Sequence, residues 1–161
     1  MSTVYEQVSH QQMHNYYMTV CKAMSCAQYY PGVIVALSRG GLDFGVKLSH
    51  WYEDAQFVPL VWQTRDGTIQ DGETLLELIN SNAGRSVLVV DDICDSGTTL
   101  LGIEDYLTKN GAGDQVDYAV AIHNADNEFE PTWWGRTIYR NQDPQWFLFP
   151  WENWYHTGDT T

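Results

Sequence analysis

Basic side chains are scarce in this 161-residue sequence: 8 Lys and Arg stand against 21 Asp and Glu, and the formal net charge is −13. Duplex DNA, RNA and anionic lipid surfaces select basic patches, so this balance argues against each of them as the main partner. A small phosphorylated ligand is still compatible with it, because Mg²⁺ can supply positive charge and acidic side chains can hold the Mg²⁺. We therefore expect no nucleic-acid partner and no membrane partner.

Long apolar runs are absent as well. No stretch approaches the roughly 20 apolar residues that a helix needs to cross a bilayer, and the first ten residues, MSTVYEQVSH, lack the basic flank and apolar segment of a signal peptide. Hydrophobic residues make up 43% of the chain, which is enough for a core. We expect one domain over residues 1–161 and a cytoplasmic location.

Cysteine is also rare. The three cysteines, Cys21, Cys26 and Cys94, form no paired pattern, and the C-x4-C spacing of the first two has no second pair and no adjacent histidine. Reduced thiols are therefore expected rather than disulfides or a zinc site. Cys94 is interpreted as a small spacer residue, with a catalytic thiol as the alternative.

Short apolar runs alternate with helical patterns along the chain. Residues 9–12 have the pattern of a capping box, and apolar residues recur at helical spacing from Met13 to Ala27. Unbroken apolar strands separated by helices are typical of an α/β fold whose parallel sheet is covered on both faces. Buried strands are predicted over 33–37, 57–62, 87–90 and 116–122, and further helices over 42–52, 73–80 and from about 98 towards Gly111.

Two unusual loops follow predicted strands, SRGG at 38–41 and DDICDSGTT at 91–99. In parallel sheets ligands bind at the carboxyl ends of the strands, so both loops are expected at one edge. The segment 63–72, QTRDGTIQDG, is polar and interrupted by glycine, which predicts a mobile loop.

The adjacent acids Asp91 and Asp92 come at the end of the apolar run VLVV. Two nearby carboxylates raise each other's pKa unless a cation or donors offset their charge, and a divalent metal or ligand hydroxyl groups would do so. Neighbouring residues on a strand point to opposite faces, so only one of the two is expected to face a given pocket unless the strand has ended.

The next part of the loop, 95–99, leads into a predicted helix. Backbone N–H groups at a helix start, together with Ser and Thr hydroxyls, make an anion site, and Gly97 lets the backbone approach closely. Acids for hydroxyls and metal beside a phosphate site match the needs of a sugar phosphate. The alternative is that Asp95 only caps the helix and the acid pair is only solvated. DDICD also matches the D-D-x-x-D pattern of prenyl-diphosphate enzymes. We reject that interpretation, because in those enzymes the pattern lies on helices and occurs twice, whereas here one copy follows a predicted strand.

VLVVDDICDSGTT resembles the phosphoribosyl-diphosphate (PRPP) signature of the type I phosphoribosyltransferases. SRGG resembles the pyrophosphate loop of that family, and WFLFPWE at 146–152 resembles the purine-covering segment of its bacterial xanthine-guanine and hypoxanthine branch. The resemblance covers roughly residues 30–152. It implies the family's parallel-sheet α/β fold, with a flexible hood loop at 63–72 and a short C-terminal base-binding segment within 123–155.

The resemblance also implies roles for individual residues. The acid pair Asp91 and Asp92 would bind the ribose hydroxyls and place Mg²⁺, and Asp95 would lie near purine N7 as the candidate general base. Arg39 would supply the charge of the pyrophosphate loop, which in the family often carries a non-proline cis peptide. The implied PRPP-binding residues are Ser38, Arg39, Gly40, Gly41, Asp91, Asp92, Asp95, Ser96, Gly97, Thr98 and Thr99.

Base recognition departs from the family pattern. A lysine that meets purine O6 in the 6-oxopurine branch is matched here by His123, which can donate to O6, read another base, or be a structural histidine. Trp146 and Phe147 would bind the purine by stacking, with core packing as the alternative for Trp146. Arg65 in the hood loop either reaches the pyrophosphate or is a solvated charge.

The resemblance implies a Mg²⁺-dependent enzyme that transfers the phosphoribosyl group of PRPP to guanine, hypoxanthine or xanthine in nucleotide salvage, with PRPP and a free nucleobase as its substrates. Two alternatives stay open: a different base, and a non-catalytic PRPP- or nucleotide-binding regulator of the same fold. Relatives are commonly dimers or tetramers, and the aromatic surplus of the sequence also favours a homo-oligomer.

Overall fold

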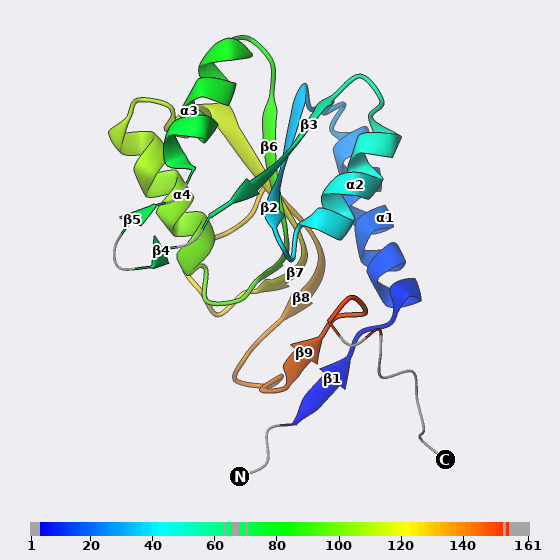
Figure 1. The fold of residues 1–161 in the computed structure, drawn as a ribbon. Helices are drawn as coiled ribbons and strands as arrows, with labels where there is room; N and C mark the ends of the chain where they lie inside the picture. Colours follow the sequence, from blue (N-terminus) through cyan, green and yellow to red (C-terminus); the bar gives the residue numbers. More distant parts are fainter. Residues whose placement is uncertain (1–3, 63, 66–67, 70, 153, 155–161) are drawn as a thin grey trace.

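The computed structural model describes residues 4–62, 64–65, 68–69, 71–152 and 154. Within this part of the chain, a parallel sheet of five strands has the order β3-β2-β6-β7-β8 (Figure 1). The strands are β2 (Val33–Ser38), β3 (Gln56–Val61), β6 (Val87–Cys94), β7 (Val116–Asn124) and β8 (Trp133–Ile138). The parallel-sheet α/β prediction is confirmed, and four of these strands match predicted apolar runs.

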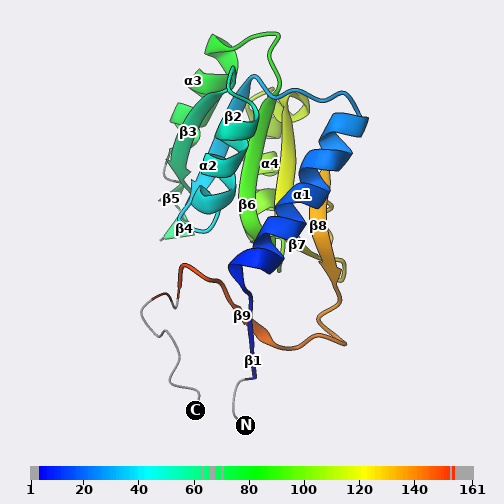
Figure 2. The same ribbon diagram turned by 90° about the vertical axis from the view of Figure 1, so that its right-hand side faces the viewer.

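Helices cover both faces of the sheet (Figure 2). On one face lie α1 (His10–Cys26) and α2 (Leu42–Trp51), and on the other lie α3 (Gly72–Ser81) and α4 (Thr98–Lys109). A short 3-10 helix, Gly113–Gln115, precedes β7. These bounds agree with the predicted helices to within a few residues. In the described part of the chain, no helix combines the length and the apolar character that crossing a membrane requires.

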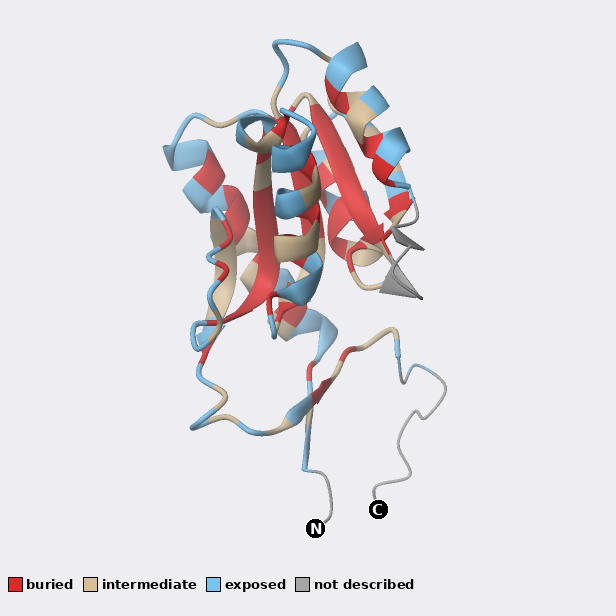
Figure 3. Ribbon diagram, turned by 90° about the vertical axis from the view of Figure 1, so that its left-hand side faces the viewer, coloured by how far each residue is buried: buried red, intermediate tan, exposed pale blue. Residues whose placement is uncertain are grey.

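Alternate residues of β2 enter two separate cores. Ile34 and Ala36 pack with α1 and α2, whereas Val33 and Val35 pack with α3 and α4. All four are fully buried, as Figure 3 shows for the centre of the sheet. Each buried aliphatic side chain stabilises the fold by about 1.5–3 kcal/mol. Because both faces are covered, the strand needs no polar residue, which explains the unbroken apolar run.

The start of α1 confirms the predicted capping box. The backbone N–H of Gln12 donates to Ser9 Oγ at 3.1 Å, and the backbone N–H of Ser9 donates to Gln12 Oε1 at 2.8 Å. Two of the unpaired N–H groups at the helix start thereby gain acceptors.

A second, two-stranded parallel sheet lies beyond the carboxyl ends of the main strands (Figures 1 and 2). It pairs β1 (Tyr5–Gln7) with β9 (Trp146–Leu148), in the register Tyr5↔Trp146. An ion pair of 2.5 Å between Glu6 and Arg136 ties β1 to β8. The N-terminal segment therefore holds the C-terminal one at the sheet edge where ligands are expected.

The predicted mobile loop at 63–72 contains the antiparallel strands β4 (Thr64–Arg65) and β5 (Thr68–Ile69). Its last residue, Gly72, already belongs to α3. Residues 63, 66–67 and 70, and the side chain of Arg65, lie outside the part of the chain that the structure describes. The hood role of this segment and the pyrophosphate role of Arg65 stay predictions.

Candidate functional site

Three cavities formed by described residues lie along the carboxyl edge of the sheet. The largest, of about 650 Å³, lies between the loop after β2, the end of β6 and the C-terminal segment. Its lining is Leu37, Ser38, Arg39, Gly40, Trp62, Asp91, Asp92, Thr99, Trp151, Glu152 and Trp154. The SRGG loop and the acid pair, about fifty residues apart in the sequence, thus meet as predicted. The sequence reasoning did not identify Trp62, Trp151 and Glu152 as members of this cavity.

The loop after β2 is packed tightly against β6. The peptide bond between Ser38 and Arg39 is cis, as the resemblance led us to expect. A Cβ atom on Gly40 would lie 2.4 Å from Asp92 Oδ2, and one on Gly41 would lie 2.4 Å from the carbonyl oxygen of Val90. Both positions therefore require glycine, because a side chain would displace the acid pair or the strand.

Both acids line the large cavity, although β6 continues through them to Cys94. The prediction that a continuing strand lets only one acid face the pocket is wrong. Pairing with β2 stops at Val90, so the next N–H groups have no strand partner on that side. The N–H of Asp92 instead donates to Asp91 Oδ1 at 2.9 Å, and that of Ile93 donates to Asp92 Oδ1 at 2.7 Å.

Burial and neighbouring negative charge make ionisation of the acid pair unfavourable. Burial, and next the charge of Asp92, raise the pKa of Asp91 well above its usual value. Burial also raises the pKa of Asp92 to about 6, and the charge of Glu152 adds to the rise. A nearby cation or hydroxyl donor would stabilise the ionised form of such carboxylates. The pair is therefore prepared for a ligand that brings positive charge or O–H groups.

Mg²⁺ fits this donor set. Two adjacent carboxylates offer hard oxygen ligands, and Mg²⁺ is commonly held by one or two carboxylates together with substrate oxygens and water. No group of three or more His, Cys, Asp or Glu side chains in the described part of the chain has the arrangement of a complete metal site. Asp91 and Asp92 would therefore hold Mg²⁺ together with a ligand, rather than as a site of protein atoms alone.

The second cavity, of about 110 Å³, is lined by residues 93–100 and opens over the start of α4. Gly97 has a φ of +79°, and a Cβ atom there would lie 2.9 Å from Asn127 Oδ1. Ser96 Oγ donates to Thr98 Oγ1 at 3.0 Å and accepts from the backbone N–H of Thr98 at 3.3 Å. Backbone N–H groups and hydroxyls surround this small space, which suits a phosphate group.

The third cavity, of about 160 Å³, lies beside the loop 95–99, the candidate phosphate loop, and is mostly apolar. Trp146 is 58% exposed and Phe147 is 3% exposed, so the two predicted base-binding residues contribute one open and one buried ring. The full lining is Ile93, Asp95, Arg140, Trp146, Phe147 and Phe149. Apolar walls with a single charged end suit a flat heterocycle with one polar edge.

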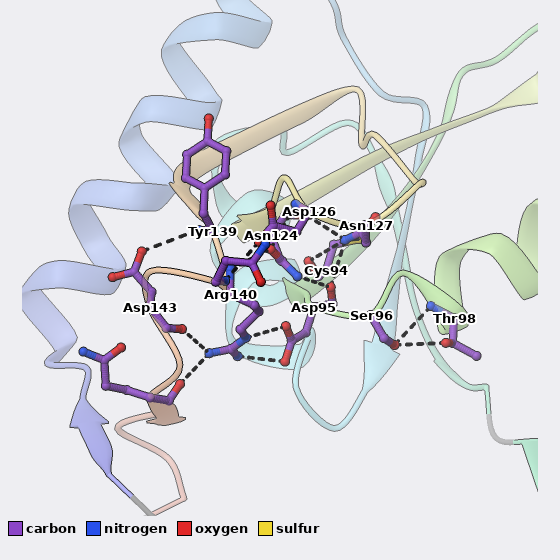
Figure 4. A network of polar contacts seen from close by, with 12 residues as sticks. Cys94, Asp95, Ser96, Thr98, Asn124, Asp126, Asn127, Tyr139, Arg140 and Asp143 are labelled. Carbon is purple, nitrogen blue, oxygen red and sulfur yellow. Dashed lines mark hydrogen bonds and ion pairs between the residues drawn. The ribbon is translucent and has the colours of Figure 1, made fainter.

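Asp95 at that charged end is bound by Arg140 (Figure 4). Arg140 Nε donates to Asp95 Oδ1 and Nη2 donates to Oδ2, both at 2.7 Å. This hydrogen-bonded ion pair raises the pKa of Arg140. The sequence reasoning missed Arg140, which follows β8 in the stretch YRNQD. The sequence offered one indication: basic residues are rare, with only 8 Lys and Arg in the chain, and this arginine comes shortly before the predicted base-binding segment at 146–152.

His123 lies at the end of β7, as predicted, but it is not among the residues that line the third cavity. Its Nε2 lies 3.0 Å from the carbonyl oxygen of Phe129, and the ring packs against Trp134 at 5.0 Å between centroids. His123 is 5% exposed. Base recognition by His123 stays a prediction, and this geometry favours the structural alternative.

All three cysteines are free thiols, as expected. Cys94 is buried, and burial raises the pKa of its thiol to about 11. A thiol with that pKa carries little thiolate near neutral pH, which favours the spacer interpretation over a catalytic thiol.

Comparison with known sequences bears on this site. Residues 13–153 match the model of the family described as phosphoribosyl transferase domain. A curated relative, a putative ribose-phosphate pyrophosphokinase 1 from Enterococcus faecalis, is 35% identical over 96 residues. That alignment covers 60% of this chain and 28% of the relative, so the chain spans less than a third of that protein.

Solved structures with the same fold cover nearly the whole chain. A purine phosphoribosyltransferase from Pyrococcus horikoshii has a TM-score of 0.70 and 22% identity, covering 92% of this chain and 94% of its own. A xanthine-guanine-hypoxanthine phosphoribosyltransferase from Helicobacter pylori has a TM-score of 0.68 and 18% identity, with 92% and 93% covered. At these identities the likeness establishes the fold.

Proposed function

The chain belongs to the phosphoribosyl transferase domain family, and from this premise we propose that it transfers the 5-phosphoribosyl group of PRPP to a 6-oxopurine base and releases pyrophosphate. The observation that carries the proposal is the meeting of three cavities at one sheet edge: a large one with the acid pair and SRGG, a small phosphate-type one, and an apolar one. PRPP and a purine together offer one part for each cavity: the ribose with its pyrophosphate, the 5′-phosphate, and the flat base.

The ribose and pyrophosphate of PRPP occupy the large cavity in this proposal. Asp91 and Asp92 accept hydrogen bonds from the ribose hydroxyls and hold Mg²⁺, and Arg39 with the backbone of 38–41 binds the pyrophosphate. Mg²⁺, when bound, supplies positive charge that offsets the charge on the departing pyrophosphate. Arg39 adds to that effect because it faces the same cavity.

The 5′-phosphate lies in the second cavity, where Ser96, Gly97, Thr98 and Thr99 surround it with hydroxyls and helix-start N–H groups. The loop 96–99, which binds the 5′-phosphate, and the acid pair, which binds the ribose hydroxyls, thus hold opposite ends of the phosphoribosyl group. With both ends held, C1 of the ribose is directed towards the third cavity, so that positioning lowers the barrier to bond formation.

The base enters the third cavity between Ile93 and the aromatic side chains of β9. Its N9 bonds to C1 as the bond from C1 to pyrophosphate breaks, and Asp95 is positioned to accept the proton that the base loses. Trp146 and Phe147 cover the base and keep water from C1. A homo-oligomeric state, a cytoplasmic location and a salvage role remain predictions.

Incubation with PRPP, Mg²⁺ and a single base tests the function. Guanine, hypoxanthine or xanthine should give the corresponding nucleotide and one equivalent of pyrophosphate, measured by chromatography. Nucleotide formed only from adenine, uracil or orotate would favour the alternative of a different base. PRPP binding without turnover of any base would favour the non-catalytic regulator instead.

A further inference from the structure

Arg140 has most of its hydrogen-bonding capacity already committed. A guanidinium group carries five N–H hydrogens. Two donate to Asp95, through Nε and Nη2 at 2.7 Å each. The two on Nη1 donate to the carbonyl oxygens of Asp143, at 3.1 Å, and of Gln145. Within the described residues, no acceptor is present for the second hydrogen on Nη2.

The backbones of Arg140 and Asp95 are linked as well as their side chains (Figure 4). The Asn124 amide accepts from the backbone N–H of Arg140 at 3.3 Å through Oδ1, and donates to the carbonyl oxygen of Asp95 at 2.9 Å through Nδ2. Asn127 Nδ2 donates to the same carbonyl oxygen at 2.9 Å. The guanidinium is therefore held at a fixed position relative to the phosphate loop.

Arg140 is also one of the residues that line the apolar cavity. The central carbon of its guanidinium lies 5.1 Å from the centroid of the Phe147 ring. Asp95 and Arg140 are the two charged residues of the cavity lining, and the other four are apolar. A flat ligand in this space would therefore contact mainly apolar side chains, and Asp95 and Arg140 are the two residues of the lining that could hydrogen-bond to it.

On the basis of the proposed function, we propose that Arg140 is a specificity-determining residue: its remaining Nη2 hydrogen donates to O6 of the purine while Asp95 accepts from N7–H. The carboxylate can do this although Arg140 occupies both its oxygens, because each oxygen has a second lone pair. A 6-amino purine would direct an N–H group at the Arg140 donor and leave that donor unpaired. Discrimination against such a base follows from that mismatch.

His123 does not compete for this role in the observed conformation, because its Nε2 is engaged by Phe129 and its ring lies against Trp134. The proposal thus assigns the O6 donor to the segment after β8, and not to the end of β7 where the sequence analysis expected it. The two positions lie near each other in space, since Asn124, the neighbour of His123, bonds to the Arg140 backbone.

Binding of nucleotide products tests the role of Arg140 without requiring turnover. Inosine 5′-monophosphate carries O6, and purine riboside 5′-monophosphate has hydrogen at that position. Calorimetric Kd values for the two compounds should differ by about 10- to 100-fold in favour of the 6-oxo compound, as expected when a charged donor loses its acceptor. Adenosine 5′-monophosphate should bind at least as weakly as the 6-hydrogen compound.

Arg140→Met should reduce the ratio of the two Kd values to within about threefold, and Arg140→Lys, which keeps a donor, should retain part of it. The ratio is insensitive to a general loss of folded protein because one sample binds both compounds. Arg136→Met is the matched control. Arg136 also pairs with an acid and lies 5.4 Å from the Phe147 centroid, but it lies outside the cavity lining, so its ratio should equal the wild-type ratio.

An unchanged ratio in Arg140→Met, or wild-type protein that does not prefer the 6-oxo nucleotide, would overturn the assignment of Arg140. If Arg140→Met does not fold, the wild-type ratio and Arg140→Lys still decide. The proposed function fails separately, through lack of turnover with every base, and that result leaves the binding ratios to judge Arg140.

Discussion

The two halves of the site differ in how the chain builds them. The half that we assign to PRPP consists of residues 38–41, the acid pair 91–92 and the loop 96–99, which lie at or shortly after the ends of the buried strands β2 and β6. The base half is assembled from the end of β6, Arg140 after β8, and β9, which pairs with β1 from the N-terminus. PRPP has two charged ends, and short loops can bind each of them with backbone N–H groups and nearby side chains. A flat base needs apolar side chains around it, and here these come from separate segments of the chain.

The largest effect should follow from neutralising the acid pair in the PRPP half. Asp91→Asn combined with Asp92→Asn removes the charges that we assign to Mg²⁺ and the ribose, and kcat/KM should fall by about 10³-fold or more. Nucleotide-formation kinetics measure the loss. Far-UV circular dichroism should show an intact fold, and a loss below tenfold would contradict the assignment.

The halves should also respond oppositely in stability. The folded pKa of Asp92, about 6, lies above its model value of 3.8. The folded state therefore binds more protons between these values, and stability falls as pH rises through that window. In metal-free protein, Asp92→Asn should raise the free energy of unfolding by about 1–3 kcal/mol at pH 7.5.

Urea denaturation with a chelator measures this gain, which should shrink as the pH falls below the folded pKa and disappear below about pH 3, where Asp92 is protonated in both states. Asp95→Asn in the base half is the contrast. It breaks an ion pair with Arg140 and should give no gain at either pH. An equal gain in both variants would show that the halves do not differ in this respect.

The phosphate loop should be sensitive to its glycine. Gly97→Ala forces a side chain into a backbone with φ of +79° and against Asn127, and the KM for PRPP should rise about tenfold. Gly111→Ala is a matched control, because its φ is +74° but nothing lies within 4 Å of its Cβ position. It should lower the melting temperature and leave the KM for PRPP unchanged.

The smallest effect is expected at the rim of the base half. Trp146→Ala removes a 58% exposed ring from the cavity and should raise the KM for the base about fivefold, with the KM for PRPP unchanged. Trp51→Ala, which removes a 51% exposed ring from the last residue of α2, should change neither value. Equal changes in both KM values would mean that the halves are not independent.

Local patterns predicted these parts of the fold well. The capping box at Ser9, the buried runs of β2 and β6, and the meeting of SRGG with the acid pair in one cavity are all present. The orientation of the acids was not predictable, because it depends on where the pairing between β2 and β6 ends, which is at Ala36 and Val90. The strands β1 and β9 were missed because three residues carry too little periodicity, and they exist only because they pair with each other.

The sequence by itself determined the α/β fold and the residues of the loops that we assign to PRPP, since strand burial and loop chemistry depend on contiguous residues. Only the tertiary structure decided which donor accompanies Asp95. Arg140 is 45 positions from Asp95, and His123, the nearer candidate along the chain, turns to the Phe129 carbonyl. Contacts over such separations depend on how strands twist and pair, which no local pattern records.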